Sequence, residues 1–320
     1  MKKITSFSAP AKVILSGEHS VVYGRPALVG AINKRLNFSL SENQFFNNKE
    51  DKSVRKIVAL IEKNVVDYLK EREIPYQKKR YFFKIDSEIP IGFGLGSSAA
   101  LSVAATACFL KFFTGKDFSK EEINHLAYQI ETYFHQNPSG VDNTASCFGG
   151  LIYYRKEFEF LKNIAFLNFK IPKNFPLFLI DSKKPKEKTK EMVQMVYKKY
   201  QKNNNSLLES IFSDMEKVTK KMVLAIKEKN KFLFQQSLLD NEIFLEILGV
   251  VSSKTKKFLQ RLSSFGVGKI TGAGGKEEGS GFILFFAEKE KQLIDFLKKE
   301  KINFFKLSLD NKGVYEQSKN

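Results

Sequence analysis

The residues best suited to chemistry fall in four short segments, and the most distinctive of them is rich in glycine. It reads Pro-Ile-Gly-Phe-Gly-Leu-Gly-Ser-Ser-Ala-Ala over residues 90–100, between a predicted strand at 81–85 and a predicted apolar helix at 98–113. Glycines at alternate positions let the backbone approach a ligand closely, and the free N–H groups that open a helix attract anions. The segment predicts a phosphate-binding loop, although a tight strand-to-helix junction would favour the same glycines.

Two carboxylates form the second segment. Glu131 lies near the end of a predicted helix that opens with the capping box Ser-Lys-Glu-Glu at 119–122. Asp142 follows the helix-breaking sequence Asn-Pro-Ser-Gly at 137–140. Across such a chain reversal one carboxylate can hold a metal ion while the other accepts a proton. The alternatives are a surface charge for Glu131 and a helix N-cap for Asp142.

The third and fourth segments add a lysine, a turn and a second glycine cluster. Lys12 lies in an apolar strand and needs an acidic or phosphate partner there, unless this strand is an edge that faces water. Glu18 and His19 follow on a turn from which side chains can reach a substrate. The sequence Lys-Ile-Thr-Gly-Ala-Gly-Gly at 269–275 is a further, weaker indication of close backbone approach to a ligand.

The elements that must position these segments divide the chain into a strand-rich and a helix-rich part. Hydrophobic periodicity predicts helices at 53–71, over most of 186–265 and at 289–300. Short strands are predicted at 4–7, 12–15, 27–29, 36–40, 149–154, 175–180, 282–286 and 304–309. We therefore expect two domains, 1–165 and 166–320.

Composition excludes several classes of protein. The chain has 320 residues, 42% hydrophobic and 28% charged, which excludes a disordered chain or a small disulfide scaffold. Its net charge of +18 comes mainly from lysine, with 7 Arg among the 53 basic residues, and favours a solvated surface over nucleic-acid recognition. The longest apolar run, 99–110, is shorter than the ~20 residues of a membrane span. Residues 1–5 carry two lysines with no uninterrupted apolar stretch behind them, so we expect no signal peptide. Two cysteines, Cys108 and Cys147, cannot form a disulfide framework, and we therefore expect a cytoplasmic protein.

Together the four segments resemble the GHMP kinase superfamily and, within it, the mevalonate kinase family. The first motif spans 9–24, and its Glu-His pair followed by Val-Val-Tyr-Gly is the discriminating part. The phosphate loop at 94–100, Glu131 with the 135–143 segment, and the glycines at 269–275 complete the set. Two departures occur: Gln136 stands where the family commonly has glycine, and Lys-Glu-Glu at 276–278 interrupts the third motif.

The resemblance implies an α+β fold of two lobes. The N-terminal lobe would be a ribosomal-S5-like βα domain and bind ATP, and the C-terminal lobe a ferredoxin-like βα domain with extra helices. The active site would lie between the lobes. The implied reaction is ATP-dependent phosphorylation of the primary hydroxyl of mevalonate to 5-phosphomevalonate, in isoprenoid biosynthesis, with Mg²⁺ as the metal ion. The alternatives are another GHMP kinase acceptor, such as phosphomevalonate, a sugar or a sugar alcohol, and a non-enzymatic protein, either a sensor with the kinase fold or a nucleic-acid binder. Dimerisation is common among relatives, so a homodimer is an alternative to a monomer.

The resemblance also assigns roles to residues. Asp142 would take or orient the proton of the acceptor hydroxyl, and Lys12 would stabilise the developing charge. Glu131 and Ser98 would hold Mg²⁺. The ATP phosphates would lie over Gly92, Gly94, Leu95, Gly96, Ser97, Ser98 and Ala99. The mevalonate site would be lined by Glu18, His19, Ser139, Gly140, Thr189, Gly272 and Ala273.

Overall fold

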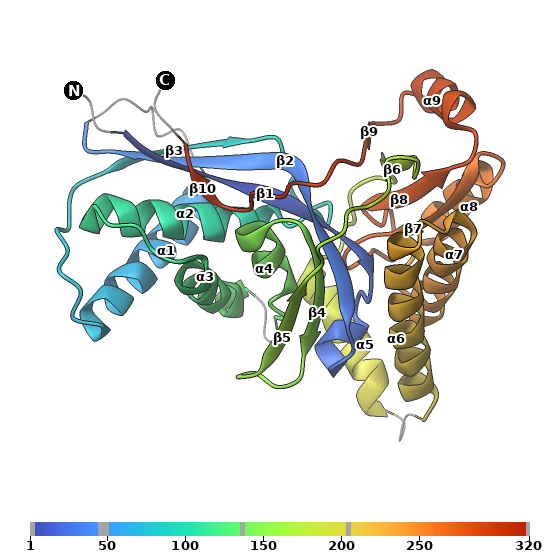
Figure 1. Ribbon diagram of the computed structural model, residues 1–320, viewed down its shortest axis with the longest axis horizontal. Helices are drawn as coiled ribbons and strands as arrows, with labels where there is room; N and C mark the ends of the chain where they lie inside the picture. The colour runs from blue at the N-terminus through green and yellow to red at the C-terminus, as the bar shows by residue number, and fades with distance from the viewer. Residues whose placement is uncertain (1–3, 44–50, 135–137, 203–205, 318–320) are drawn as a thin grey trace.

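A computed structural model describes residues 4–43, 51–134, 138–202 and 206–317, which form two antiparallel sheets with their helices (Figure 1). The first sheet has the strand order β10-β1-β2-β4-β5, and β3 pairs with β2 beside this path. Its strands are β1 (Ile4–Ser16), β2 (Ala27–Ser41), β3 (Phe82–Ser87), β4 (Leu151–Lys156), β5 (Lys162–Phe166) and β10 (Tyr315–Glu316). The α+β architecture expected from the sequence is confirmed.

The first two strands are longer than predicted. The four short strands expected between residues 4 and 40 are two continuous strands, β1 and β2, paired from Ile4↔Ser41 to Ser16↔Leu28. The register shifts between Pro10 and Ala11. Such an irregularity accommodates a proline that cannot donate to the ladder. The sequence prediction of a break at this point was therefore wrong.

Four helices lie against one face of the first sheet (Figure 1). They are α1 (Lys52–Glu71), α2 (Ser97–Thr114), α3 (Lys120–Phe134) and α4 (Val141–Phe148). The expected capping box opens α3, because the Ser119 backbone N–H donates to Glu122 and the Glu122 N–H donates to the Ser119 hydroxyl. Helix α2 has the length and apolar composition of a membrane span, but 72% of it is buried within the structure. It is a core helix of the first lobe.

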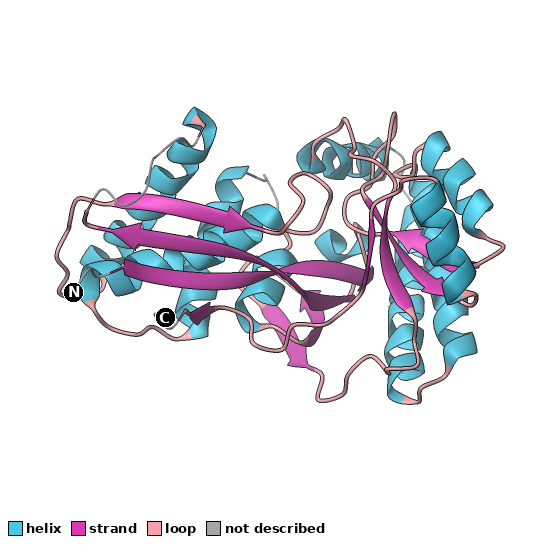
Figure 2. Cartoon of the chain, turned by 90° about the horizontal axis from the view of Figure 1, so that it is seen from above, coloured by secondary structure: helices cyan, strands magenta, loops and turns pink. Residues whose placement is uncertain are grey.

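The second sheet has the order β7-β8-β6-β9 and stands beside the first one (Figure 2). Its strands are β6 (Leu177–Asp181), β7 (Gly266–Ile270), β8 (Phe282–Ala287) and β9 (Phe304–Lys306). The helical stretch predicted over 186–265 is resolved into four helices, and a fifth follows β8. These are α5 (Thr189–Lys202), α6 (Ser206–Lys227), α7 (Lys231–Leu248), α8 (Ser253–Leu262) and α9 (Glu290–Lys299).

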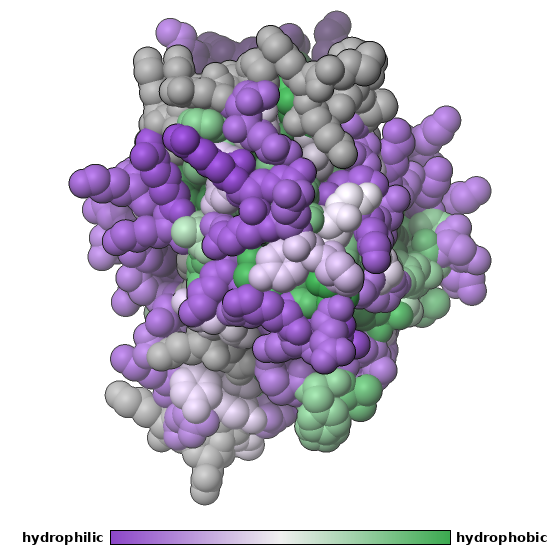
Figure 3. Space-filling model, turned by 90° about the vertical axis from the view of Figure 1, so that its left-hand side faces the viewer, coloured by the Kyte–Doolittle hydropathy of each residue, from purple (hydrophilic) through white to green (hydrophobic). Residues whose placement is uncertain are grey.

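The two lobes share part of one hydrophobic core. A single cluster joins side chains of α2 and β1 to Met222, Phe234 and Phe282 of the second lobe. The surface outside this core is strongly hydrophilic on the face seen in Figure 3, which is dominated by polar side chains. This distribution agrees with the interpretation of the lysine surplus as a solvated surface.

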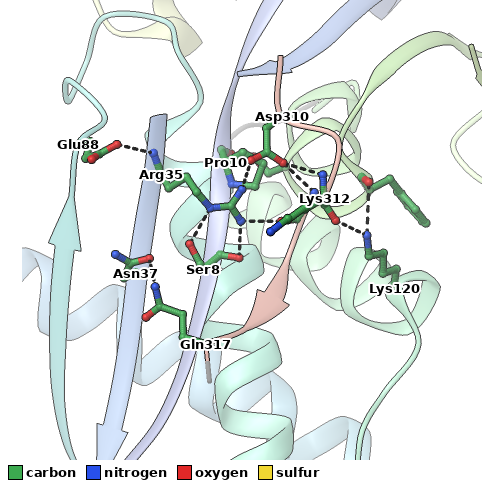
Figure 4. A network of polar contacts seen from close by, with 12 residues as sticks. Ser8, Pro10, Arg35, Asn37, Glu88, Lys120, Asp310, Lys312 and Gln317 are labelled. Carbon is green, nitrogen blue, oxygen red and sulfur yellow. Dashed lines mark hydrogen bonds and ion pairs between the residues drawn. The ribbon is translucent and has the colours of Figure 1, made fainter. Parts of the chain in front are cut away.

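The end of the chain returns to the first sheet. Leu309 forms a bridge with Ile32, and β10 pairs with β1 in the register Phe7↔Glu316. Arg35 of β2 fastens this return (Figure 4): it forms an ion pair with Asp310 and donates to the carbonyl oxygens of Ser8 and Gly313 at 3.0 and 2.6 Å. The C-terminal segment therefore completes the N-terminal lobe.

Candidate active site

The glycine-rich loop leads from β3 into the first turn of α2. Gly92, Gly94 and Gly96 have φ values of 84°, 82° and 75°, a region that favours glycine. A Cβ placed on Gly96 would lie 2.9 Å from Cγ of Lys12, and one on Gly94 would lie 3.0 Å from the carbonyl oxygen of Thr271. Gly96 is the N-cap of α2, and among the described residues no side-chain hydrogen bond caps this end. The first N–H groups of α2 therefore remain available to an anion.

Lys12 and Asp142 form an ion pair beside this loop. The Lys12 Nζ lies 3.1 Å from Oδ1 of Asp142, and the Lys12 backbone N–H donates to the carbonyl oxygen of Leu95 at 3.0 Å. The Lys12 side chain is 3% exposed and that of Asp142 is 36% exposed. Asp142 is thus the acidic partner that Lys12 requires, and the carboxylate keeps one side open to solvent. The N-cap of α4 is Gly140, so Asp142 occupies the first helical turn instead.

Glu131 is buried on α3 and shares the electrostatic environment of this pair. Glu131 is 5% exposed, so the alternative of a surface charge is wrong. The pKa of Glu131 is raised to about 8, mainly by burial and also by the negative charge of Asp142, while Lys12 partly opposes both effects. Glu131 therefore lies close enough to the Lys12–Asp142 pair for both charges to act on it, and Lys12 lies against Gly96 at the start of α2.

Glu18 points toward the second lobe. Its carboxylate forms an ion pair with Lys269 of β7 and accepts a hydrogen bond from Nδ2 of Asn241 on α7 at 3.1 Å. Glu18 is 1% exposed and Lys269 is 0% exposed. The Lys269 ammonium also donates to the carbonyl oxygens of Ile14 and Ile270, at 3.3 and 2.7 Å. Through these bonds Glu18 links the first lobe to β7 and α7 of the second lobe.

Sequence reasoning missed the partners of Glu18. Lys269 was considered only as the start of a glycine segment, and Asn241 was not considered at all. The spacing of Phe234, Leu238 and Leu245 on α7 places Asn241 on the buried face of that helix. A polar residue on such a face needs a partner, which is a signal that the sequence does contain.

His19 connects the turn after β1 with the third glycine segment. Its Nε2 lies 3.1 Å from the carbonyl oxygen of Ala273. Burial lowers the pKa of His19 to about 4, against a smaller opposing effect of that hydrogen bond, so the imidazole is neutral at pH 7. Gly272 precedes Ala273, and a Cβ on Gly272 would lie 3.0 Å from Cα of Gly94. Gly272 and Ala273 therefore lie between the glycine-rich loop and His19.

The segment before Asp142 is held by β4. The hydroxyl of Tyr154 donates to the carbonyl oxygen of Ser139, and a Cβ on Gly140 would lie 2.8 Å from the same hydroxyl. Thr189 is the exposed first residue of α5, and no recorded contact within the described ranges links it to the other predicted site residues. Residues 135–137, which belong to the predicted motif, lie outside the described residues.

The acidic interruption of the third glycine motif lies at the surface. Glu278 forms an ion pair with Lys254 at 2.6 Å, and Glu277 forms one with Lys186 at 3.4 Å. The Glu277 backbone N–H also donates to Glu187 at 3.0 Å. The extra charges are therefore neutralised by neighbouring lysines of the second lobe.

This combination of fold and glycine-rich loop is that of the GHMP kinases. The family model described as "GHMP kinases N terminal domain" matches residues 56–150, which contain the loop, Glu131 and Asp142. The two-lobed GHMP kinase fold expected from the sequence is thereby confirmed.

Whole-chain comparisons lead to a narrower family. Mevalonate kinase of Pyrococcus abyssi is 33% identical over 304 residues, covering 86% of this chain and 87% of the relative. Mevalonate kinase of Methanocaldococcus jannaschii is 31% identical, covering 94% of this chain and 98% of the relative. The crystal structure of the Methanococcus jannaschii mevalonate kinase matches with a TM-score of 0.76 at 26% identity, covering 97% of this chain and 99% of that one. The chain belongs to the mevalonate kinase family.

Proposed function

We propose that this protein transfers the γ-phosphoryl group of ATP to the primary hydroxyl of mevalonate, giving 5-phosphomevalonate. The observation that carries the proposal is the ion pair of Lys12 with Asp142 beside the N-cap of α2, with the buried Glu131 near enough for both charges to act on it. Membership in the mevalonate kinase family supports the choice of acceptor.

The nucleotide binds with its phosphates over residues 92–99, where the uncapped N–H groups of α2 offer positive partial charge. Asp142 faces the acceptor hydroxyl with its open side and takes or orients the hydroxyl proton. Lys12, held by its backbone bond to Leu95, stabilises the charge on Asp142 and on the group in transfer. Positioning and charge neutralisation provide most of the rate gain in such reactions.

The residues at this site also fit a magnesium ion. Mg²⁺ prefers one or two protein oxygen ligands together with substrate phosphates and water. Glu131 supplies a buried carboxylate, and Ser98 supplies an exposed hydroxyl in the first turn of α2. The described residues contain no cluster of three His, Cys, Asp or Glu side chains that could hold a metal ion, so the phosphates and water would supply the remaining ligands. When bound, the ion neutralises phosphate charge.

The mevalonate site is proposed to lie around His19, Ser139, Gly140, Gly272 and Ala273, with Glu18 behind the turn that carries His19. Thr189 is proposed as a further contact from α5. The division into domains at residues 165 and 166 also stays a proposal. It is supported by the change of sheet between β5, which ends at Phe166, and β6, which begins at Leu177, while β10 near residue 316 returns to the first sheet.

A coupled assay of ADP release with a panel of acceptors tests the proposal. The panel contains mevalonate, phosphomevalonate, galactose and a sugar alcohol, each with ATP and Mg²⁺. We expect turnover with mevalonate to exceed that with every other acceptor by at least about a hundredfold, because a site built for one hydrogen-bonding pattern rejects others strongly. Turnover with a sugar and none with mevalonate would contradict the proposal.

A further inference from the structure

A segment of the second lobe is tied closely to the glycine-rich loop. Ser182 follows β6, and its backbone N–H and hydroxyl both donate to the carbonyl oxygen of Gly281, at 3.0 and 2.8 Å. The Gly281 N–H donates back to the carbonyl oxygen of Lys183 at 3.1 Å. A Cβ on Gly281 would lie 2.6 Å from the carbonyl oxygen of Phe93, in the glycine-rich loop. The chain at 182–183 is therefore fixed relative to this loop.

The backbone at Lys183, just after the hydrogen bonds between Ser182 and Gly281, has an unusual conformation. Its φ is 81°, in the region that favours glycine and costs energy in a lysine. The next residue, Lys184, lies across the first glycine of the loop. A Cβ on Gly92 would lie 2.6 Å from Cε and 3.2 Å from Nζ of Lys184. The anchored, strained turn thus places an ammonium group directly on the loop.

No described residue neutralises the charge of Lys184. Two lysines of the same surface have acidic partners, since Lys186 pairs with Glu277 and Lys254 pairs with Glu278. In the part of the chain that the structure describes, Lys184 has no recorded ion pair or hydrogen bond of its ammonium group. An unpaired cation beside a loop that offers helix N–H groups complements a polyphosphate.

We propose that Lys184 binds the phosphate chain of the nucleotide from the second lobe, opposite the N–H groups of α2. The inference rests on the proposed function, since it assumes that ATP binds over residues 92–99. It adds a phosphate-binding residue that lies outside the four sequence motifs. It also assigns a purpose to the strained backbone of Lys183, which directs the next side chain onto Gly92.

Equilibrium binding of ATP and adenosine to the whole protein, by calorimetry with Mg²⁺ at fixed salt, tests this assignment. We expect Lys184→Gln to weaken ATP binding about fivefold to tenfold, as the loss of one partly exposed charge contact does. Adenosine has no phosphate, so its affinity should not change. Lys184→Arg should keep most of the ATP affinity, and raising the salt should reduce ATP affinity less in Lys184→Gln than in the parent protein.

Lys298→Gln is the matched control, because Lys298 is an exposed lysine on α9 of the same lobe. It removes the same charge and should leave both affinities unchanged. Unchanged ATP affinity in Lys184→Gln, or an equal loss for ATP and adenosine, would overturn the assignment while leaving the proposed function intact. Failure of the parent protein to bind ATP would instead overturn the proposed function and the assignment together.

Discussion

The buried pair between Glu18 and Lys269 offers a quantitative test of how the lobes are held together. Replacing Lys269 by methionine keeps most of the side-chain volume and removes the charge. Glu18, 1% exposed, would then keep only the hydrogen bond from Asn241. Breaking a buried ion pair on one side costs about 3–5 kcal/mol, because the remaining charge has no adequate partner.

The effect should be visible in both chemical and thermal unfolding. We expect the free energy of unfolding, measured by urea titration and circular dichroism, to fall by about 3–5 kcal/mol in Lys269→Met. At roughly 2 °C for each kcal/mol in a large domain, the melting temperature should fall by at least about 6 °C. The double variant Glu18→Gln/Lys269→Met, which buries no charge, should recover more than half of the lost free energy.

An exposed ion pair in the same lobe serves as the control. Lys306 and Glu290 pair at 2.7 Å with side chains 58% and 40% exposed, so Lys306→Met should leave the unfolding transition unchanged. The reasoning would be refuted if Lys269→Met lowered the free energy of unfolding by less than about 1 kcal/mol. It would also be refuted if the loss in the double variant equalled the sum of the losses in the two single variants.

Three further predictions concern the site itself. Asp142→Asn should lower kcat by about 10²–10⁴ in steady-state assays and leave the ATP dissociation constant nearly unchanged, because it removes a proton acceptor and no phosphate contact. Glu131→Gln should raise the Mg²⁺ concentration needed for half-maximal activity, and an identical Mg²⁺ titration would remove Glu131 from the metal site. His19 has a pKa near 4 in the folded protein and about 6.5 when unfolded, so between these values the unfolded chain binds more protons and folding stability rises with pH. Stability measured by urea unfolding should therefore fall as the pH is lowered from 6.5 toward 4, and His19→Asn should flatten this slope.

Local patterns were sufficient to locate the main elements. The capping box at 119–122, the apolar run that became α2 and the long helical stretch after residue 186 all depend on neighbours in sequence. Helix α4 was missed because it follows a Pro-Ser-Gly break and because eight residues are too few to show a clear helical periodicity. Strand β10 has two residues and exists only through its pairing with β1.

The geometry of the site depended on contacts between distant segments. The sequence could not decide whether Lys12 faced water, since alternation permits either side of a strand. The strand is buried on both sides around Lys12, because α2 and α4 pack on one face and the second lobe closes the other. Glu131 likewise looked like an ordinary helix charge. Its burial in the folded chain and, to a smaller extent, its proximity to Asp142, which chain reversal produces, raise its pKa.

The return of the C-terminal segment, fixed by Arg35 and Asp310, has a consequence for synthesis on the ribosome. Leu309 pairs with Ile32 of β2 and β10 covers the outer edge of β1, yet both are made after every other strand of this sheet. Until they emerge, β1 carries an unpaired edge of the kind that promotes aggregation. The nascent first lobe should therefore need protection until residues 309–316 have been made, and a shortened gene product ending before residue 309 should precipitate when expressed.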